Sequence, residues 1–142
     1  MPFDDASGRR LRAWLALAPR TFYDPETVAI LPVGLCWPGR GASGDRPPRP
    51  ECAPLWHARV RALLGDIELV LALGRHAVER ELGPSKAPLM ARVAAGDPAR
   101  DRVLALPHPS PRNQAVLARH PWFEAEFLAT LRGRLAAFEV AT

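Results

Sequence analysis

The sequence predicts an α/β domain with three layers, in which a short central parallel sheet lies between helices. Three apolar runs, Val28–Leu35, Ile67–Gly74 and Arg102–Leu106, alternate with segments of helical periodicity. This alternation implies parallel strands joined by helical crossovers that cover both faces of the sheet. A length of 142 residues fits a single domain, and we find no internal repeat or domain boundary. We therefore expect residues 1–142 to form one domain.

The first half of the chain contains one helix, one strand and one long loop. Apolar residues recur at helical spacing behind an acidic cap, which predicts a helix over Ser7–Leu17. The continuous apolar run Val28–Leu35 is typical of a strand buried on both faces. Pro32 removes one backbone donor and places this run at the edge or the end of a strand. The segment Cys36–Pro54 is rich in proline and glycine and is predicted to lack regular structure.

The second half alternates the other two strands with helices. Helices are predicted over Leu55–Leu64, Arg75–Leu82, Leu89–Ala94, Arg112–Arg119 and Pro121–Phe138. Four aromatic residues at apolar helical positions are expected in the core: Trp14, Trp56, Trp122 and Phe123. Three histidines are expected at the surface or at helix caps: His57, His76 and His120.

The composition indicates a soluble protein with a basic surface. The net charge is +4, the isoelectric point is near 10.0, and every cation except Lys86 is an arginine. Arginine suits forked contacts with phosphate, so a polyanion is a plausible partner, although a compositional bias of the coding DNA explains the same excess. No apolar run is long enough to cross a bilayer, and the acidic N-terminus does not fit a secretory signal. We expect a cytoplasmic monomer without a membrane partner.

The segment Pro107–Asn113, PHPSPRN, follows the third predicted strand directly. Its prolines make a stiff loop that continues neither a strand nor a helix. At the carboxyl end of a parallel strand, His108 can donate a hydrogen bond or carry a proton. Ser110, Arg112 and Asn113 can hold a phosphate. The alternative is a proline-rich turn with a structural histidine.

The two cysteines, Cys36 and Cys52, flank the long loop. In a cytoplasmic protein a disulfide is disfavoured, which leaves buried thiols or metal ligands. A zinc site that also uses His57 lacks a clear fourth ligand.

The motif HPSPRN resembles the second active-site motif of the uracil-DNA glycosylase superfamily, in the variant of its single-strand-selective branch. The resemblance implies that His108 is catalytic and stabilises the oxyanion that develops on uracil as the glycosidic bond breaks. It further implies a loop in the DNA minor groove, where Pro109, Ser110 and Pro111 compress the backbone and Arg112 and Asn113 contact it.

The cysteine pattern resembles that of the iron-sulfur uracil-DNA glycosylases, in which K-C-x-P-P is followed by E-x-x-x-C-x-P. Cys36 and Cys52 would then supply half of the ligands of a 4Fe-4S cluster. The segment around Phe3 resembles the family's G-x-P-F segment, which implies that this ring stacks on a flipped base. The implied activity is DNA base-excision repair, the hydrolysis of the N-glycosidic bond of uracil or a related damaged base in single- or double-stranded DNA.

The sequence departs from this family in two places. Three upstream features of the family have no counterpart in this sequence: a C-x-x-C pair, the first central strand of a sheet ordered 2-1-3-4, and the loop that positions the attacking water. The resemblance therefore implies an N-terminally shortened domain. We favour a start codon assigned too late over a shortened relative, because apolar strand faces would otherwise be exposed. Pro32 stands where iron-sulfur members have a base-reading asparagine, which indicates an altered base preference.

Two other interpretations stay open at this point. A noncatalytic nucleic-acid-binding relative would keep the basic loop without the water-activating motif. An unrelated α/β domain would match HPSPRN by coincidence. Salt-dependent DNA binding and base release distinguish the three.

Overall fold

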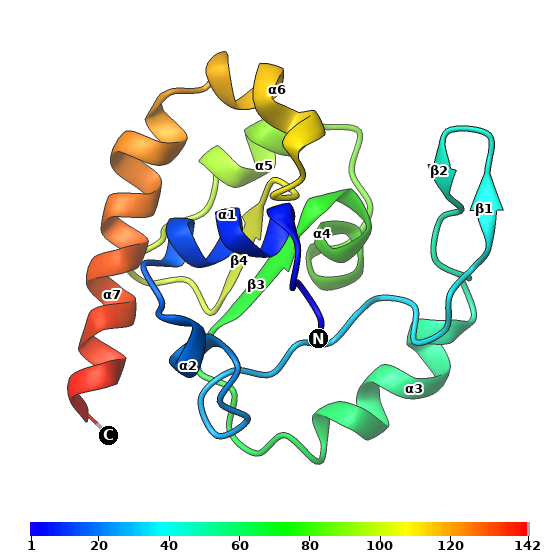
Figure 1. The fold of residues 1–142 in the computed structure, drawn as a ribbon, viewed down its shortest axis with the longest axis horizontal. Coiled ribbons are helices and arrows are strands. Elements are labelled where there is room, and N and C mark those ends of the chain that lie inside the picture. The colour runs from blue at the N-terminus through cyan, green and yellow to red at the C-terminus, as the bar shows by residue number, and fades with distance from the viewer. Residues whose placement is uncertain (142) are drawn as a thin grey trace.

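A computed structural model describes residues 1–141 of the chain, with the side chains of residues 1–138. Its helices and strands are drawn in Figure 1. In chain order they are α1 (Ala6–Leu15), α2 (Pro19–Phe22), β1 (Arg40–Gly41), β2 (Gly44–Asp45), α3 (Cys52–Arg61), β3 (Val70–Leu73), α4 (Gly74–Leu82), α5 (Leu89–Ala94), β4 (Val103–Leu106), the 3-10 turn η1 (Pro111–Asn113), α6 (Gln114–Ala118), the π-helical turn η2 (Phe123–Phe127) and α7 (Leu128–Ala141).

Strands β3 and β4 form a parallel pair, in which Val70 is opposite Val103 and Leu73 is opposite Leu106. The three consecutive residues Leu104–Leu106 are all buried. Because successive side chains of a strand point to opposite faces, both faces of β4 are covered. The crossover from β3 to β4 contains α4 and α5, and both helices contact β4. This arrangement confirms the predicted α/β fold with a small parallel sheet.

Helices α1 and α7 complete the core. In Figure 1, α1 crosses in front of the sheet and α7 runs along its left-hand side. The ring of Trp14 meets the ring of Phe123 edge to face, with centroids 5.0 Å apart, and both side chains are buried. The side chain of Arg132 bridges the helices by donating to the carbonyl of Trp14 at 2.8 Å. Trp56, in contrast, is 45% exposed on α3, so the expectation that it lies in the core was wrong.

The predicted strand Val28–Leu35 does not form, and this prediction was wrong. The segment has no regular structure, and none of its side chains is buried. Its polar backbone groups bond to α3 instead: the carbonyl of Pro32 accepts from Nε2 of His57 at 3.0 Å, and the N–H of Leu35 donates to Sγ of Cys52 at 3.2 Å. The physical reason is the lack of a partner strand, because the sheets of the described residues pair only β1 with β2 and β3 with β4. His57 is 3% exposed, so its predicted surface position was also wrong.

The segment Cys36–Pro54 is not wholly irregular, as predicted, but contains an antiparallel hairpin of β1 and β2. Arg40 pairs with Asp45 and Gly41 pairs with Gly44. A two-residue turn closes the hairpin, and Gly44 adopts a φ of 135° that other residues rarely take.

The helix boundaries differ from the predicted ones mainly at prolines. Helix α3 begins at Cys52 rather than Leu55, because Pro54 is accommodated in a first helical turn that needs no backbone donor. The predicted helices over Arg112–Arg119 and Pro121–Phe138 begin with the turns η1 and η2. The short helix α2 was not predicted. No helix in residues 1–141 is long and apolar enough to cross a membrane.

Candidate functional site

The loop after β4 presents one histidine between two anchored prolines. Pro107 and Pro109 are less than 2% exposed, whereas His108 between them is exposed. Proline fixes φ, so the backbone on both sides of His108 is restricted. The carboxyl end of β4 therefore holds a positioned imidazole at the edge of the sheet where open α/β folds bind their ligands.

Hydrogen bonds within the loop fix the ring of His108. Nδ2 of Asn113 donates to the backbone carbonyl of His108 at 2.7 Å and closes the loop. The backbone N–H of Ser110 donates to Nδ1 of His108 at 3.2 Å. Because Nδ1 accepts this bond, the proton of the neutral imidazole lies on Nε2. The group that His108 offers to a ligand is thus Nε2–H.

Two opposing effects set the protonation state of His108. The protein atoms around the ring withdraw it from water and lower the pKa of His108 below its ordinary value of 6.5, while the nearby carboxylate of Asp5 raises this pKa by less. The net shift is downward, so the imidazole is neutral at pH 7. A neutral imidazole can donate from Nε2 to developing negative charge without first losing a proton.

Phe3 comes from the other end of the chain and lies beside His108. The two ring centroids are 6.5 Å apart and the planes are tilted by 35°. Phe3 has a φ of 57°, a left-handed conformation that is rare for a bulky residue. Its carbonyl accepts hydrogen bonds from Nη1 of Arg12 at 3.2 Å and from the hydroxyl of Tyr23 at 3.1 Å. These bonds hold the strained backbone and keep the ring near His108.

Two residues that the sequence analysis did not assign to the site also support this loop. A Cβ atom at Gly74 would lie 3.1 Å from Cβ of His108, and Gly74 has a φ of 78°. Arg10 donates to the carbonyl of Ser110 at 3.1 Å and to Oε1 of Gln114 at 2.7 Å. A glycine at a strand-to-helix junction signals such a close approach. Nothing in the sequence linked Arg10 to the loop.

The predicted DNA-contacting residues of the loop take different positions. Pro109 lies buried beneath the loop, whereas Pro111 is exposed. Oγ of Ser110 accepts from the backbone N–H of Arg112 at 3.3 Å and caps the turn η1. The side chain of Asn113 bonds to the carbonyl of His108. Among the predicted DNA-contacting residues, Arg112 therefore supplies the charged group that extends from the loop.

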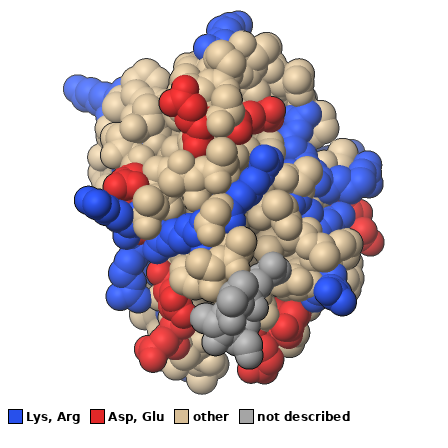
Figure 2. Space-filling view, turned by 90° about the vertical axis from the view of Figure 1, so that its left-hand side faces the viewer, with Lys and Arg blue, Asp and Glu red and all other residues tan. Residues whose placement is uncertain are grey.

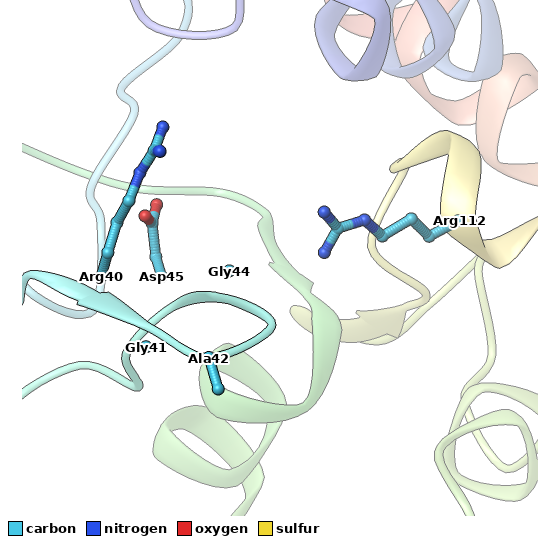
Figure 3. A pocket seen from close by; sticks show the side chains of 6 residues that line it. All are labelled: Arg40, Gly41, Ala42, Gly44, Asp45 and Arg112. Atoms are coloured by element: carbon cyan, nitrogen blue, oxygen red, sulfur yellow. The ribbon is translucent and has the colours of Figure 1, made fainter.

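The side chain of Arg112 reaches toward the hairpin of β1 and β2. Its Nη1 lies 3.5 Å from the carbonyl of Ser43. Between the hairpin and the loop is a cavity of about 490 Å³, and Figure 3 shows the side chains of Arg40 and Arg112 extending into this region from two sides. Its lining residues are Arg40, Gly41, Ala42, Gly44, Asp45 and Arg112.

The two cysteines differ in environment. Cys36 is exposed, Cys52 is buried at the start of α3, and both are free thiols. A 4Fe-4S cluster needs four ligands, whereas the sequence has two cysteines. Among the described residues, no three His, Cys, Asp or Glu side chains gather closely enough to hold a metal ion. The donors of this chain therefore do not fit a complete cluster. The zinc alternative is not supported either, because Cys36, Cys52 and His57 do not gather into such a group among the described residues.

The face that carries α7 is not a continuous basic surface. Figure 2 shows blue cationic and red acidic side chains interspersed on that side of the molecule. An interspersed surface has no strong field of one sign, so it does not attract a polyanion. Of the arginines, Arg10 contacts the His108 loop through the carbonyl of Ser110, and Arg112 contacts the hairpin through the carbonyl of Ser43.

The fold and this loop together define a class: an α/β protein that presents a neutral histidine and an aromatic ring at the carboxyl end of a parallel strand. The comparison with known families gives the identity. The family model described as the uracil DNA glycosylase superfamily matches residues 1–132, and the chain belongs to this superfamily. Membership indicates a function of the DNA-repair glycosylase type, with DNA as the substrate.

Proposed function

We propose that the chain acts in base-excision repair and hydrolyses the N-glycosidic bond of uracil, or of a related damaged base, after the base has been flipped out of DNA. Flipping is required because the reacting carbon is inaccessible within the base stack. The observation that carries the proposal is the hydrogen bond from Ser110 N–H to Nδ1 of His108, which leaves Nε2–H as a free donor.

The proposed chemistry is electrostatic. As the glycosidic bond breaks, the departing base carries the bonding electrons as an anion, and Nε2–H of His108 donates to its oxygen. Water attacks the sugar carbon and supplies the hydroxyl group of the product, and the proton that this water loses neutralises the base anion. Removal of one oxyanion donor costs about 3 to 4 kcal/mol in comparable sites.

Phe3 is proposed to hold the base while His108 polarises it. A ring 6.5 Å from the imidazole can stack on an extruded base that lies against the histidine. Stacking of this kind contributes about 1 to 3 kcal/mol per base. Arg112 is proposed to bind a backbone phosphate, while Ser110, Pro111 and Asn113 shape the loop that enters the groove. The likeness of HPSPRN to the single-strand-selective branch stays a proposal from the resemblance. The same holds for Cys36 and Cys52 as half of the ligands of a 4Fe-4S cluster.

The test is the release of free base from a uracil-containing single strand and from the corresponding duplex. We expect release by the wild type and a loss of about 100- to 1,000-fold in His108→Ala. His120→Ala is the matched control, because His120 bonds to the carbonyl of Val116 in α6 and is not among the residues proposed to contact the base or the DNA. Equal rates in both variants would contradict the proposal.

A second candidate is a noncatalytic nucleic-acid-binding relative. Pro32 favours it, because proline offers no side-chain donor to read a base, and its carbonyl is engaged by His57. This candidate predicts salt-dependent DNA binding without base release from any lesion.

A further inference from the structure

The hairpin segment from Trp37 to Arg46 is a structured arm beside the His108 loop. In Figure 1, β1 and β2 stand out on the right-hand side of the molecule. The arm is closed by the hydrogen bond from Arg46 N–H to the carbonyl of Gly39 at 2.9 Å. Arg112 connects the arm to the loop through the carbonyl of Ser43, and a Cβ atom at Gly44 would lie 3.4 Å from the Arg112 guanidinium. The tip of the arm is therefore close to the loop that carries His108.

Two guanidinium groups lie at the cavity between the arm and the loop. Arg40 extends from the arm and Arg112 from η1, as Figure 3 shows. In the part of the chain that the structure describes, neither arginine forms an ion pair with an acid. Arginine without a carboxylate partner is suited to a phosphate, because its planar fork matches two phosphate oxygens.

The acid of the cavity has a different partner. Oδ1 of Asp45 accepts a hydrogen bond from Nε1 of Trp37 at 3.3 Å. This bond restrains the indole, yet 69% of the Trp37 surface is exposed. A restrained, exposed aromatic ring close in sequence to Arg40 combines the two features with which proteins bind single-stranded nucleic acid: a platform for an unpaired base and a cation for the backbone.

We propose that Trp37, Arg40 and Arg112 form a second nucleotide site, which binds the single-stranded DNA next to the flipped nucleotide. Arg40 and Arg112 bind the phosphate backbone, Trp37 stacks on an unpaired base, and Asp45 positions the indole. The inference rests on the proposed function for its substrate, because Arg112 belongs to the same loop as His108. The alternative use of an exposed tryptophan is a protein contact, which the two unpaired arginines do not favour.

The experiment measures binding of labelled oligothymidylates by fluorescence anisotropy. Strands of about 4 and about 16 nucleotides are compared, since ssDNA sites span this range. We expect Trp37→Leu to weaken binding of the long strand about 5- to 150-fold and to leave a blunt duplex, which offers no unpaired base, nearly unaffected. Arg40→Gln should weaken the long strand as well and reduce the slope of log K against log salt by about 1.

The controls make the same chemical changes elsewhere. Arg100→Gln removes an exposed cation that precedes β4, at the opposite end of the strand from His108, and Trp56→Leu removes a partly exposed indole on α3. Both should bind the long strand as the wild type does. If Trp37→Leu and Arg40→Gln bind the long strand with the affinity of the wild type, the proposal is overturned and Trp37 is better explained by a protein partner. If Trp37→Leu weakens binding of the blunt duplex as much as binding of the long strand, the stacking role is overturned.

Base release from a short uracil-containing strand separates this inference from the proposed function. If the wild type and Trp37→Leu release base equally from the short strand and bind the long strand equally, the second site fails and the glycosylase function stands. If no protein releases base but Trp37→Leu still weakens binding of the long strand, the glycosylase function fails and the second site stands.

Discussion

The ring of Phe3 lies 6.5 Å from the ring of His108, so the beginning of the chain and the loop after its last strand form a single site. The backbone of Phe3 is held in a left-handed conformation by Arg12 and Tyr23, and Nδ1 of His108 is engaged by Ser110. The backbone strain of Phe3 is thus maintained by hydrogen bonds, and it lies beside the fixed donor of His108. Backbone strain of this kind is typical of binding sites.

Replacement of Phe3 tests the stacking role. In Phe3→Ala we expect binding of a single strand with an extrudable uracil to weaken about 5- to 150-fold, because a stacked base loses about 1 to 3 kcal/mol. Phe3→Tyr keeps the ring and should bind nearly as the wild type does. The measurement is a binding titration with inactive His108→Ala as the background. Equal affinity of the Phe3→Ala and Phe3→Tyr proteins would contradict the role.

The pH profile of base release tests the neutral state of His108. Burial lowers the pKa of His108 below 6.5, so the neutral donor should persist at pH 7 and release should fall only below pH 6.5. The unfolded chain binds this proton more readily than the folded one, so the contribution to stability is present above pH 6.5 and decreases as the pH falls. An NMR titration of the ring checks the direction of the shift. A pKa above 6.5 would contradict it.

A substitution at Gly74 tests the packing beneath the histidine. Gly74→Ala places a Cβ atom 3.1 Å from Cβ of His108 and forces a φ of 78° on a residue that disfavours it. We expect a loss of about 1 to 2 kcal/mol in the free energy of unfolding and a shifted His108 resonance. Gly133→Ala on α7 is the control, because a Cβ there meets nothing within 4 Å. Thermal unfolding and NMR spectra give both readouts, and equal effects of the two substitutions would show that the contact is unimportant.

The two thiols should differ in reactivity. Cys36 is exposed and Cys52 is 7% exposed, so we expect a maleimide to label Cys36 rapidly and Cys52 only in denaturant. Mass spectrometry of the Cys36→Ser and Cys52→Ser variants identifies the labelled site. Rapid labelling of the Cys36→Ser protein under native conditions would show that Cys52 is accessible and would contradict its burial at the start of α3.

The amino-acid sequence by itself determined the local elements and the histidine loop. The helix α5 and the strand β4 lie within a residue of their predicted bounds, because apolar periodicity and turn residues act over short distances. The loop around His108 could be recognised because proline restricts its own backbone wherever it stands. The family match over residues 1–132 agrees with the resemblance that these residues carry.

Only the tertiary structure decided which segments found partners. Val28–Leu35 has the composition of a buried strand, but a strand needs a neighbour for its backbone bonds, and this segment bonds to α3 instead. Three contacts of the site join residues that are distant in the chain: Phe3 with His108, Arg10 with Ser110, and Arg112 with Ser43 of the hairpin. Local propensity carries no information about such contacts, because they arise when helices and loops pack around the sheet.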